Sequence, residues 1–165
     1  MKINLTQNKN FKLFKIISKV AQENNQTVYI VGGYVRDLLM QRKAPTDIDF
    51  VTEQSGIELA KAVGKELGDL KVSVFKTYGT AMIKYKDLDL EFVGARKESY
   101  SEDSRKPAVE TGTLEDDQKR RDFTVNALAI SLNAENFGEL IDPFNGREDM
   151  LNKILRTPLE PAQTY

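Results

Sequence analysis

The segment 27–40 constrains the fold more than any other part of the sequence. The run 27–31 consists of β-favouring residues, Gly32 and Gly33 follow it, and a helical pattern occupies 34–40. Because β-branched and aromatic residues favour strands and glycines end them, the order of these residues is informative. The segment predicts a strand, a glycine turn and a helix in direct succession.

The rest of the chain predicts further elements of both kinds. Apolar residues at helical spacing predict helices over 10–22, 55–68 and 118–126. Short β-rich runs predict strands over 47–51, 71–76, 81–85, 88–93, 127–132 and 139–142. The polar segment from Lys97 to Asp117 has no period, so a long and mobile loop is expected there. We expect one α+β domain, in which helices flank a mixed or antiparallel sheet.

Two absences narrow the chemistry of the chain. The 165 residues include no cysteine, which excludes disulfides and thiolate metal sites, and no histidine, which excludes catalytic triads and histidine-bound zinc. Catalysis must depend on carboxylates, lysine, arginine, tyrosine or hydroxyl groups, and oxygen ligands favour Mg²⁺, Mn²⁺ or Ca²⁺. The net charge is −1, so bulk charge does not indicate a nucleic-acid partner. The lack of a long apolar run and of a signal peptide predicts a soluble, cytoplasmic protein without a membrane partner.

The sharpest chemical feature is the pair Asp47 and Asp49. Alternate side chains of a strand share one face, so both carboxylates point the same way while Ile48 and Phe50 point into the core. Two neighbouring carboxylates repel each other unless cations lie between them, which suits two Mg²⁺ ions in phosphoryl transfer. Taken alone, the pair is weak evidence, because solvated acids at a strand edge or turn are the more common explanation of such a triplet.

The glycine turn upstream favours a phosphate site. Gly32 and Gly33 allow backbone amides to approach a phosphate, and Arg36 lies in the first turn of the following helix. The segment lacks the Gly-Lys-Ser/Thr end of a Walker A loop and the third glycine of the dinucleotide motif. A tight turn without a ligand remains the alternative.

Two further segments carry candidate groups. Asp87, Asp89 and Glu91 alternate along one predicted strand face, and any of them is a candidate third carboxylate; a polar outer strand face is the alternative. In the segment 119–127, Arg121 is placed to neutralise a triphosphate and Asn126 to bond a ribose or phosphate oxygen, unless the segment is only an exposed charge cluster.

In combination, these segments resemble the bacterial-type (class II) tRNA nucleotidyltransferase and poly(A) polymerase family, part of the DNA polymerase β-like nucleotidyltransferase superfamily. The order and spacing of the similar segments match over about residues 27–157. They are Gly32-Gly33-x-Val35-Arg36-Asp37-x-Leu39, Asp47-x-Asp49, Glu91-x4-Arg96, Arg120-Arg121-Asp122-Phe123-Thr124-x-Asn126-Ala127 and Ile141-Asp142-Pro143-Phe144-Asn145-Gly146.

The resemblance implies a role for each matching residue. Asp47 and Asp49 are expected to hold two Mg²⁺ ions, which Mn²⁺ can replace, with Glu91 as the third catalytic carboxylate. The expected nucleotide site consists of Gly32, Gly33, Arg36, Arg121, Asp122 and Asn126. The segment from Asp142 to Arg147 resembles the family's hinge, and the loop from Lys97 to Asp117 resembles a loop that helps to switch from C to A addition.

The resemblance also implies a division of the chain and of the reaction. Residues 1–157 are expected to form the catalytic head, and 158–165 the start of the next domain, the neck. In the family, a Glu-Asp-x-x-Arg motif in the neck reads the base of CTP or ATP, and further domains hold the 3′ end of tRNA; none of these lies within this sequence. CCA addition to tRNA is the expected activity of the parent protein. A poly(A), CC-only or A-only polymerase head and a non-catalytic nucleotide-binding module are the alternatives.

Overall fold

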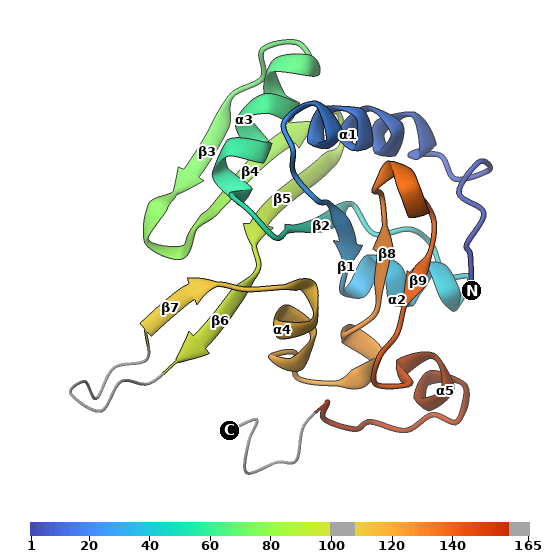
Figure 1. Cartoon of the computed structure of the whole chain (residues 1–165). Helices are drawn as coiled ribbons and strands as arrows, with labels where there is room; N and C mark the ends of the chain where they lie inside the picture. Colours follow the sequence, from blue (N-terminus) through green and yellow to red (C-terminus); the bar gives the residue numbers. More distant parts are fainter. Residues whose placement is uncertain (100–107, 159–165) are drawn as a thin grey trace.

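A mixed sheet of seven strands forms the centre of the molecule (Figure 1). The computed structural model describes residues 1–99 and 108–158. The order across the sheet is β3-β4-β5-β2-β1-β8-β9. β2 and β5 are parallel and every other pair of neighbours is antiparallel, which confirms the mixed sheet. The strands are β1 Tyr29–Val31, β2 Asp47–Thr52, β3 Val72–Phe75, β4 Thr80–Tyr85, β5 Leu88–Gly94, β8 Ala129–Ser131 and β9 Leu140–Ile141.

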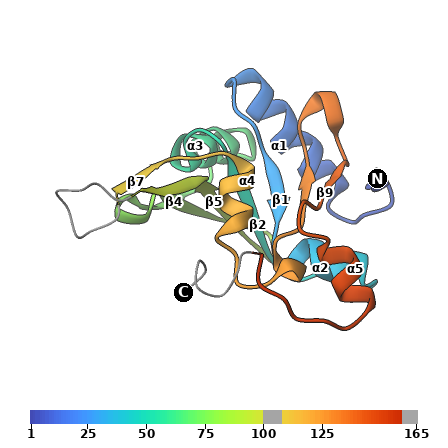
Figure 2. The same ribbon diagram turned by 60° about the horizontal axis from the view of Figure 1, so that its bottom comes forward.

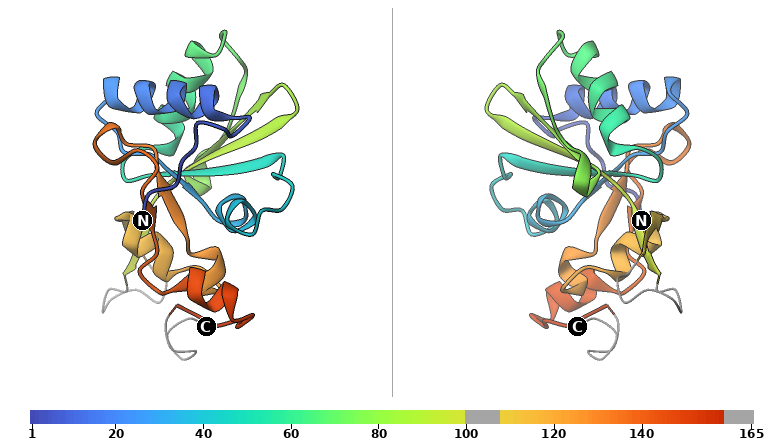
Figure 3. Two further views of the ribbon diagram at one scale, coloured as in Figure 1. Left: turned by 90° about the vertical axis from the view of Figure 1, so that its right-hand side faces the viewer. Right: turned by 90° about the vertical axis from the view of Figure 1, so that its left-hand side faces the viewer.

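Two helices, α1 Phe11–Glu23 and α3 Gly56–Glu66, cover one face of the sheet (Figure 3). Phe14 of α1 packs against Phe50 of β2, and both lie in the main hydrophobic core with Ile48. Ile48 and Phe50 are fully buried, as the alternation along this strand predicts. Burial of this face forces Asp47 and Asp49 onto the opposite face of β2.

The opposite face carries a smaller core and a short helix. Helix α4, Leu114–Lys119, inserts Leu114 against Val31 and Val51 of the sheet. Beside it, β6 Arg96–Ser99 and β7 Ala108–Thr111 form a separate antiparallel pair of strands. The acids of β2 therefore lie on the face of the sheet that α4 covers only in part.

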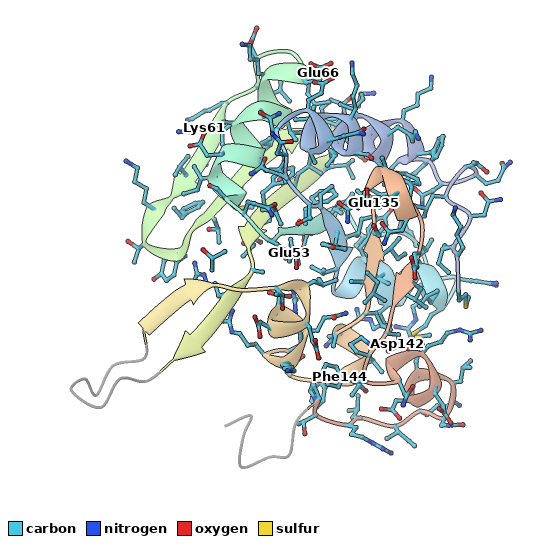
Figure 4. The ribbon with its side chains drawn as sticks, viewed as in Figure 1. Glu53, Lys61, Glu66, Glu135, Asp142 and Phe144 are labelled. Carbon is cyan, nitrogen blue, oxygen red and sulfur yellow. The ribbon has the colours of Figure 1, made fainter. Side chains whose placement is uncertain are left out.

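One end of the sheet gathers α2, η2 and α5 (Figure 2). These elements are α2 Gly33–Leu39, the 3-10 helix η2 Thr124–Asn126 and α5 Gly146–Leu151. The carboxylate of Asp142, labelled in Figure 4, accepts hydrogen bonds from the backbone N–H groups of Gly146 and Arg147 at 2.6 and 3.0 Å, which satisfies the free donors at the start of α5. The other short helices are η1 Lys76–Tyr78 and η3 Ala134–Asn136.

The expected loop from Lys97 to Asp117 is wrong for its described part. β6 and β7 pair within it, and α4 begins at Leu114. Polar strands that pair only with each other lack the apolar alternation that identifies half-buried strands, so the sequence gives no period there. Residues 100–107, which the same expectation covers, lie outside the described residues.

The expected helix over 118–126 is also wrong. α4 begins four residues earlier, where Thr113 and Asp116 form a reciprocal capping box, and it ends at Lys119. Phe123 is extended, with φ −133° and ψ 151°, so η2 is a separate turn. The domain boundary expected at 157/158 stays a prediction, because residues 159–165 lie outside the described part of the chain.

The other helices and strands that the sequence predicts agree with the structure within about two residues at either end. Ser55 caps α3 by accepting a hydrogen bond from the backbone N–H of Glu58 at 3.1 Å. Gly79 and Lys86 have positive φ angles of 65° and 56° in the two turns around β4. No helix in the described ranges is long and apolar enough to cross a membrane.

Candidate active site

Carboxylates on two parallel strands meet in the middle of the sheet. β2 and β5 run side by side, and their register places Asp49 opposite Glu91 and Asp47 opposite Asp89. Partners in register on neighbouring strands have side chains on the same face. Asp49 and Glu91, which lie 42 positions apart in the sequence (91 − 49), therefore project together from the half-covered face.

The register distinguishes the three candidates for a third carboxylate. Glu91 lies beside Asp49, whereas Asp89 forms an ion pair with Lys84 at 3.7 Å. Asp87 lies in the turn between β4 and β5, outside either strand. The structure thus brings Glu91, and not Asp87, into contact with the aspartate pair.

Burial and mutual repulsion act on the acids of the site. Burial is the largest cause that raises the pKa of Asp49, and the nearby cation Arg121 opposes it. Burial also raises the pKa of Glu91, and the charge of Asp49 adds to the effect. Among residues 1–99 and 108–158, no three acidic side chains converge closely enough to form a ready-made metal cage. Asp47, Asp49 and Glu91 form an acid row along β2 and β5. The combined negative charge of this acid row is unfavourable until a cation offsets it.

Gly32 lies between an acid and a cation of the site. It precedes α2 with φ 74° and ψ −143°, a conformation close to a region that glycine almost alone adopts. A Cβ atom at Gly32 would lie 3.6 Å from Arg121 Nη1 and 3.7 Å from Asp49 Oδ2. The glycine therefore leaves open space where the backbone, a guanidinium and a carboxylate come together.

A second group of predicted residues forms a hydrogen-bonded chain at the start of α2. Arg36 donates from Nη1 to Asn126 Oδ1 at 2.9 Å and from Nε to Asp37 Oδ1 at 3.0 Å. Asn126 donates from Nδ2 to Asp122 Oδ1 at 3.2 Å. Gly33 adjoins this chain, because a Cβ atom there would lie 3.3 Å from Arg36 Nη2. The structure thus connects α2 with η2 through a chain of polar side chains.

Arg121 is held by a residue that the sequence analysis did not single out. Asp117, one helical turn earlier, accepts hydrogen bonds from Arg121 Nε at 3.2 Å and Nη2 at 2.9 Å, both on Oδ2. Only 6% of Asp117 is exposed. The spacing of four residues between an acid and a base was the available signal. The expected helix start at 118 concealed it, because it left Asp117 outside the predicted helix.

Two cavities adjoin the predicted residues. One of about 320 Å³ has Glu91 and Arg121 in its wall, together with Tyr78 and Arg96. Another of about 450 Å³ has Arg36 and Asn126 in its wall, together with apolar side chains from η2 and α5. Neither cavity has Gly32 or Asp49 in its wall, so the predicted residues border two separate spaces, each with at least one arginine in its wall.

Two tRNA nucleotidyltransferases are similar to this chain in sequence. The chain is 47% identical over 128 residues to an A-adding tRNA nucleotidyltransferase of Aquifex aeolicus, which covers 78% of this chain and 15% of the relative. It is 33% identical over 160 residues to a CCA-adding enzyme of Anoxybacillus flavithermus, which covers 96% of this chain and 38% of the relative. The chain therefore spans well under half the length of these relatives.

A solved structure of a tRNA nucleotidyltransferase, complexed with a primer tRNA and an incoming ATP analog, superposes with a TM-score of 0.75. The identity is 41%, and the match covers 87% of this chain and 39% of that chain. The model of the poly A polymerase head domain matches residues 28–156, which include all the predicted site residues. The chain belongs to the family of poly A polymerase head domains.

Proposed function

We propose that this chain is the catalytic head of a nucleotidyltransferase that transfers CMP and AMP from CTP and ATP to an RNA 3′-hydroxyl, with CCA addition to tRNA as the parent activity. The observation that carries the proposal is the placement of Asp49 opposite Glu91, directly beside Gly32 and Arg121. This arrangement puts acids that attract cations next to a backbone turn and an arginine that attract phosphates.

The acid row fits divalent metal ions. Asp47 and Asp49 would hold two Mg²⁺ ions, or Mn²⁺ in their place, with Glu91 as the third carboxylate. All three donors are oxygens, which hard cations prefer. Burial is the largest cause that raises the pKa of Asp49 and of Glu91. This supports the fit, because burial makes the charged carboxylates unfavourable and a bound cation would offset their charge. When bound, such ions lower the pKa of the attacking hydroxyl and neutralise charge on the phosphates.

The nucleotide would lie over the start of α2. Gly32 and Gly33 would allow the triphosphate to approach the backbone, and Arg36 would bond it with its guanidinium. Arg121, two residues after the end of α4, would face it. Asp122 and Asn126, which are already joined by a hydrogen bond, would complete the site at the ribose. The polar chain from Arg36 to Asp122 supports this placement, because it holds the donors and acceptors in fixed directions before any ligand binds.

In the proposed reaction, a bond forms between the primer 3′-oxygen and the α-phosphorus, and the bond from that phosphorus to the pyrophosphate oxygen breaks. The hydroxyl proton leaves to solvent, and pyrophosphate carries away the negative charge. Arg36 and Arg121 offset that charge on the leaving group. Since the chain lacks histidine, the proton has no imidazole acceptor here. Cytoplasm is the proposed place of action.

Addition of A alone is the second candidate activity. It is favoured by the relative from Aquifex aeolicus, an A-adding enzyme whose identity of 47% exceeds the 33% of the CCA-adding relative. Extension assays with the protein that contains this chain separate the two activities. Addition to a tRNA that ends at the discriminator base indicates CCA addition, whereas addition only to a tRNA that already ends in C-C indicates A addition.

Calorimetry tests the proposed site in this chain. ATP and CTP are expected to bind in the presence of Mg²⁺ and much more weakly without it. Asp49→Asn should abolish the dependence on Mg²⁺. Asp87→Asn changes the net charge equally from a turn outside the site, so it serves as the matched control and should bind like the wild type. Metal-dependent binding that survives Asp49→Asn in a folded protein contradicts the assignment.

A further inference from the structure

The two edges of the Arg121 guanidinium face different neighbours. Its Nε and Nη2 atoms donate to one oxygen of Asp117, at 3.2 and 2.9 Å. Its Nη1 atom lies on the side of Gly32, 3.6 Å from where a Cβ atom of that glycine would be. A guanidinium is planar and rigid, so fixing one edge fixes the direction of the remaining N–H groups. Asp117 thus determines where Nη1 points.

Asp117 itself has little freedom to move, because the sheet holds α4 at both ends. At its start, Glu53, which directly follows β2, accepts a hydrogen bond from the backbone N–H of Leu114 at 3.0 Å; Figure 4 shows Glu53 at the end of β2 that faces α4. Near its end, the buried side chain of Gln118 donates to the carbonyl groups of Ala127 at 2.8 Å and Ile141 at 3.1 Å. A helix fixed in this way is a rigid base for the Asp117–Arg121 pair.

Arg121 has an alternative set of partners nearby. Arg121 Nη1 and Asp49 Oδ2 lie 3.6 and 3.7 Å from the same point, the position of a Cβ atom at Gly32, and Arg121 shares the wall of one cavity with Glu91. A guanidinium edge that is free pairs readily with a carboxylate. Asp117 accepts the hydrogen bonds of the Nε–Nη2 edge. These bonds keep that edge from pairing with the carboxylates of the acid row.

We infer that Asp117 is a positioning residue, which holds Arg121 so that its free N–H groups face the triphosphate and its pairing edge stays off the metal-binding acids. This inference rests on the proposed function for the identity of the ligand. It assigns to Asp117 a role in binding although its buried carboxylate bears the same sign of charge as the nucleotide.

The sign of charge separates positioning from simple electrostatics. Asp117→Asn removes a negative charge close to the site, which by Coulomb's law alone should strengthen the binding of an anionic nucleotide. Positioning predicts the opposite: ATP binding in the presence of Mg²⁺ should weaken about 10- to 100-fold, the range expected for the loss of a charge-assisted hydrogen bond. Glu115→Gln removes the same charge from an exposed position of the same helix and is the matched control.

A double-mutant cycle in calorimetry identifies Arg121 as the group through which Asp117 acts. Arg121→Gln should weaken ATP binding by a similar factor, and Asp117→Asn combined with Arg121→Gln should bind no more weakly than Arg121→Gln alone. Glu115→Gln should bind ATP like the wild type. Unchanged or stronger binding by Asp117→Asn, or multiplied losses in the double variant, would overturn the inference.

The orientation of Arg121 is measurable without nucleotide. In NMR spectra of the chain, the Arg121 Nε–H, identified by its loss in Arg121→Lys, should exchange slowly with water. Exchange should become fast in Asp117→Asn and remain slow in Glu115→Gln. Fast exchange in the wild type overturns the inference even if ATP binds. Slow exchange without any ATP binding refutes the proposed function, but it still establishes that Asp117 fixes the orientation of Arg121. If Asp117→Asn does not fold, Asp117→Glu is used in its place. The inference is overturned if Asp117→Glu shows Nε–H exchange as slow as the wild type and unchanged ATP binding.

Discussion

Replacement of Gly32 by alanine tests the geometry at the centre of the candidate site. The cost is expected from backbone strain, not from a clash, because the nearest atoms to a Cβ lie at ordinary contact distances of 3.6 and 3.7 Å. The φ angle of 74° with ψ of −143° is unfavourable for any L side chain, which costs about 1–3 kcal/mol. For a chain of 165 residues, this loss lowers Tm by about 3–9 °C.

Gly33→Ala is the matched control, one residue later and with the opposite expectation. Gly33 begins α2 with helical geometry, where alanine is favoured over glycine by up to about 1 kcal/mol. Its Cβ would meet only the end of the Arg36 side chain at 3.3 Å, which can shift. Gly33→Ala should therefore leave the free energy of unfolding unchanged or raise it slightly.

Thermal and urea unfolding of the two variants, with calorimetry of ATP and Mg²⁺, make up the assay. Gly32→Ala should lose both stability and ATP binding, since its methyl group fills the space between Arg121 and Asp49. The reasoning is refuted if Gly32→Ala is as stable as the wild type, or if both variants lose stability equally.

Three other variants give measurable results. Asp49→Asn should raise the free energy of unfolding at pH 7: the pKa of Asp49 is raised in the folded state, so the wild type loses stability as pH rises from the unfolded value of about 3.9 through the folded value. Urea unfolding of both proteins at pH 3.5 and pH 7 checks this. An increase in the free energy of unfolding that is larger at pH 3.5 than at pH 7 contradicts it. Arg36→Ala should weaken ATP binding by about 1.5–3 kcal/mol while adenosine binding changes little; equal losses in calorimetry refute a phosphate contact. Gly146→Ala should lower Tm, because a Cβ would lie 2.1 Å from the Thr124 carbonyl oxygen and overpacking costs about 1–3 kcal/mol or more; an unchanged Tm excludes this contact.

Local patterns predicted those elements whose apolar residues face the main core. The alternation of Ile48 and Phe50 with the acids identified β2, and Ser55 marked the start of α3. The β6–β7 pair escaped prediction because its strands pair only with each other. α5 was also missed: its start depends on the carboxylate of Asp142, which accepts from the backbone four and five residues later.

The candidate site required long-range register that no local pattern contains. Periodicity left Asp87, Asp89 and Glu91 equivalent, and only the parallel pairing of β2 with β5 places Glu91 against Asp49. The resemblance to a family selected Glu91 as the third carboxylate, and the register places this residue opposite Asp49. Its catalytic role remains a prediction.

Asp117 shows a different limit. Its function depends on the direction of one hydrogen-bonded edge of Arg121, which follows from the position of α4 on the sheet. The sequence contains the spacing of the two residues, but the burial of Asp117 depends on Glu53 and Gln118, whose contacts with α4 and the sheet are tertiary.

A crystal structure of the chain with Mn²⁺ and an ATP analogue that cannot be cleaved between the α- and β-phosphorus tests the central claim most directly. The anomalous signal of Mn²⁺ should appear within about 2.0–2.2 Å of carboxylate oxygens of Asp47 and Asp49, a distance typical of hard cations. The phosphates should lie against the backbone of Gly32 and within hydrogen-bond distance of Arg121. Metal bound at other acids, or a triphosphate placed away from the start of α2, would contradict the account.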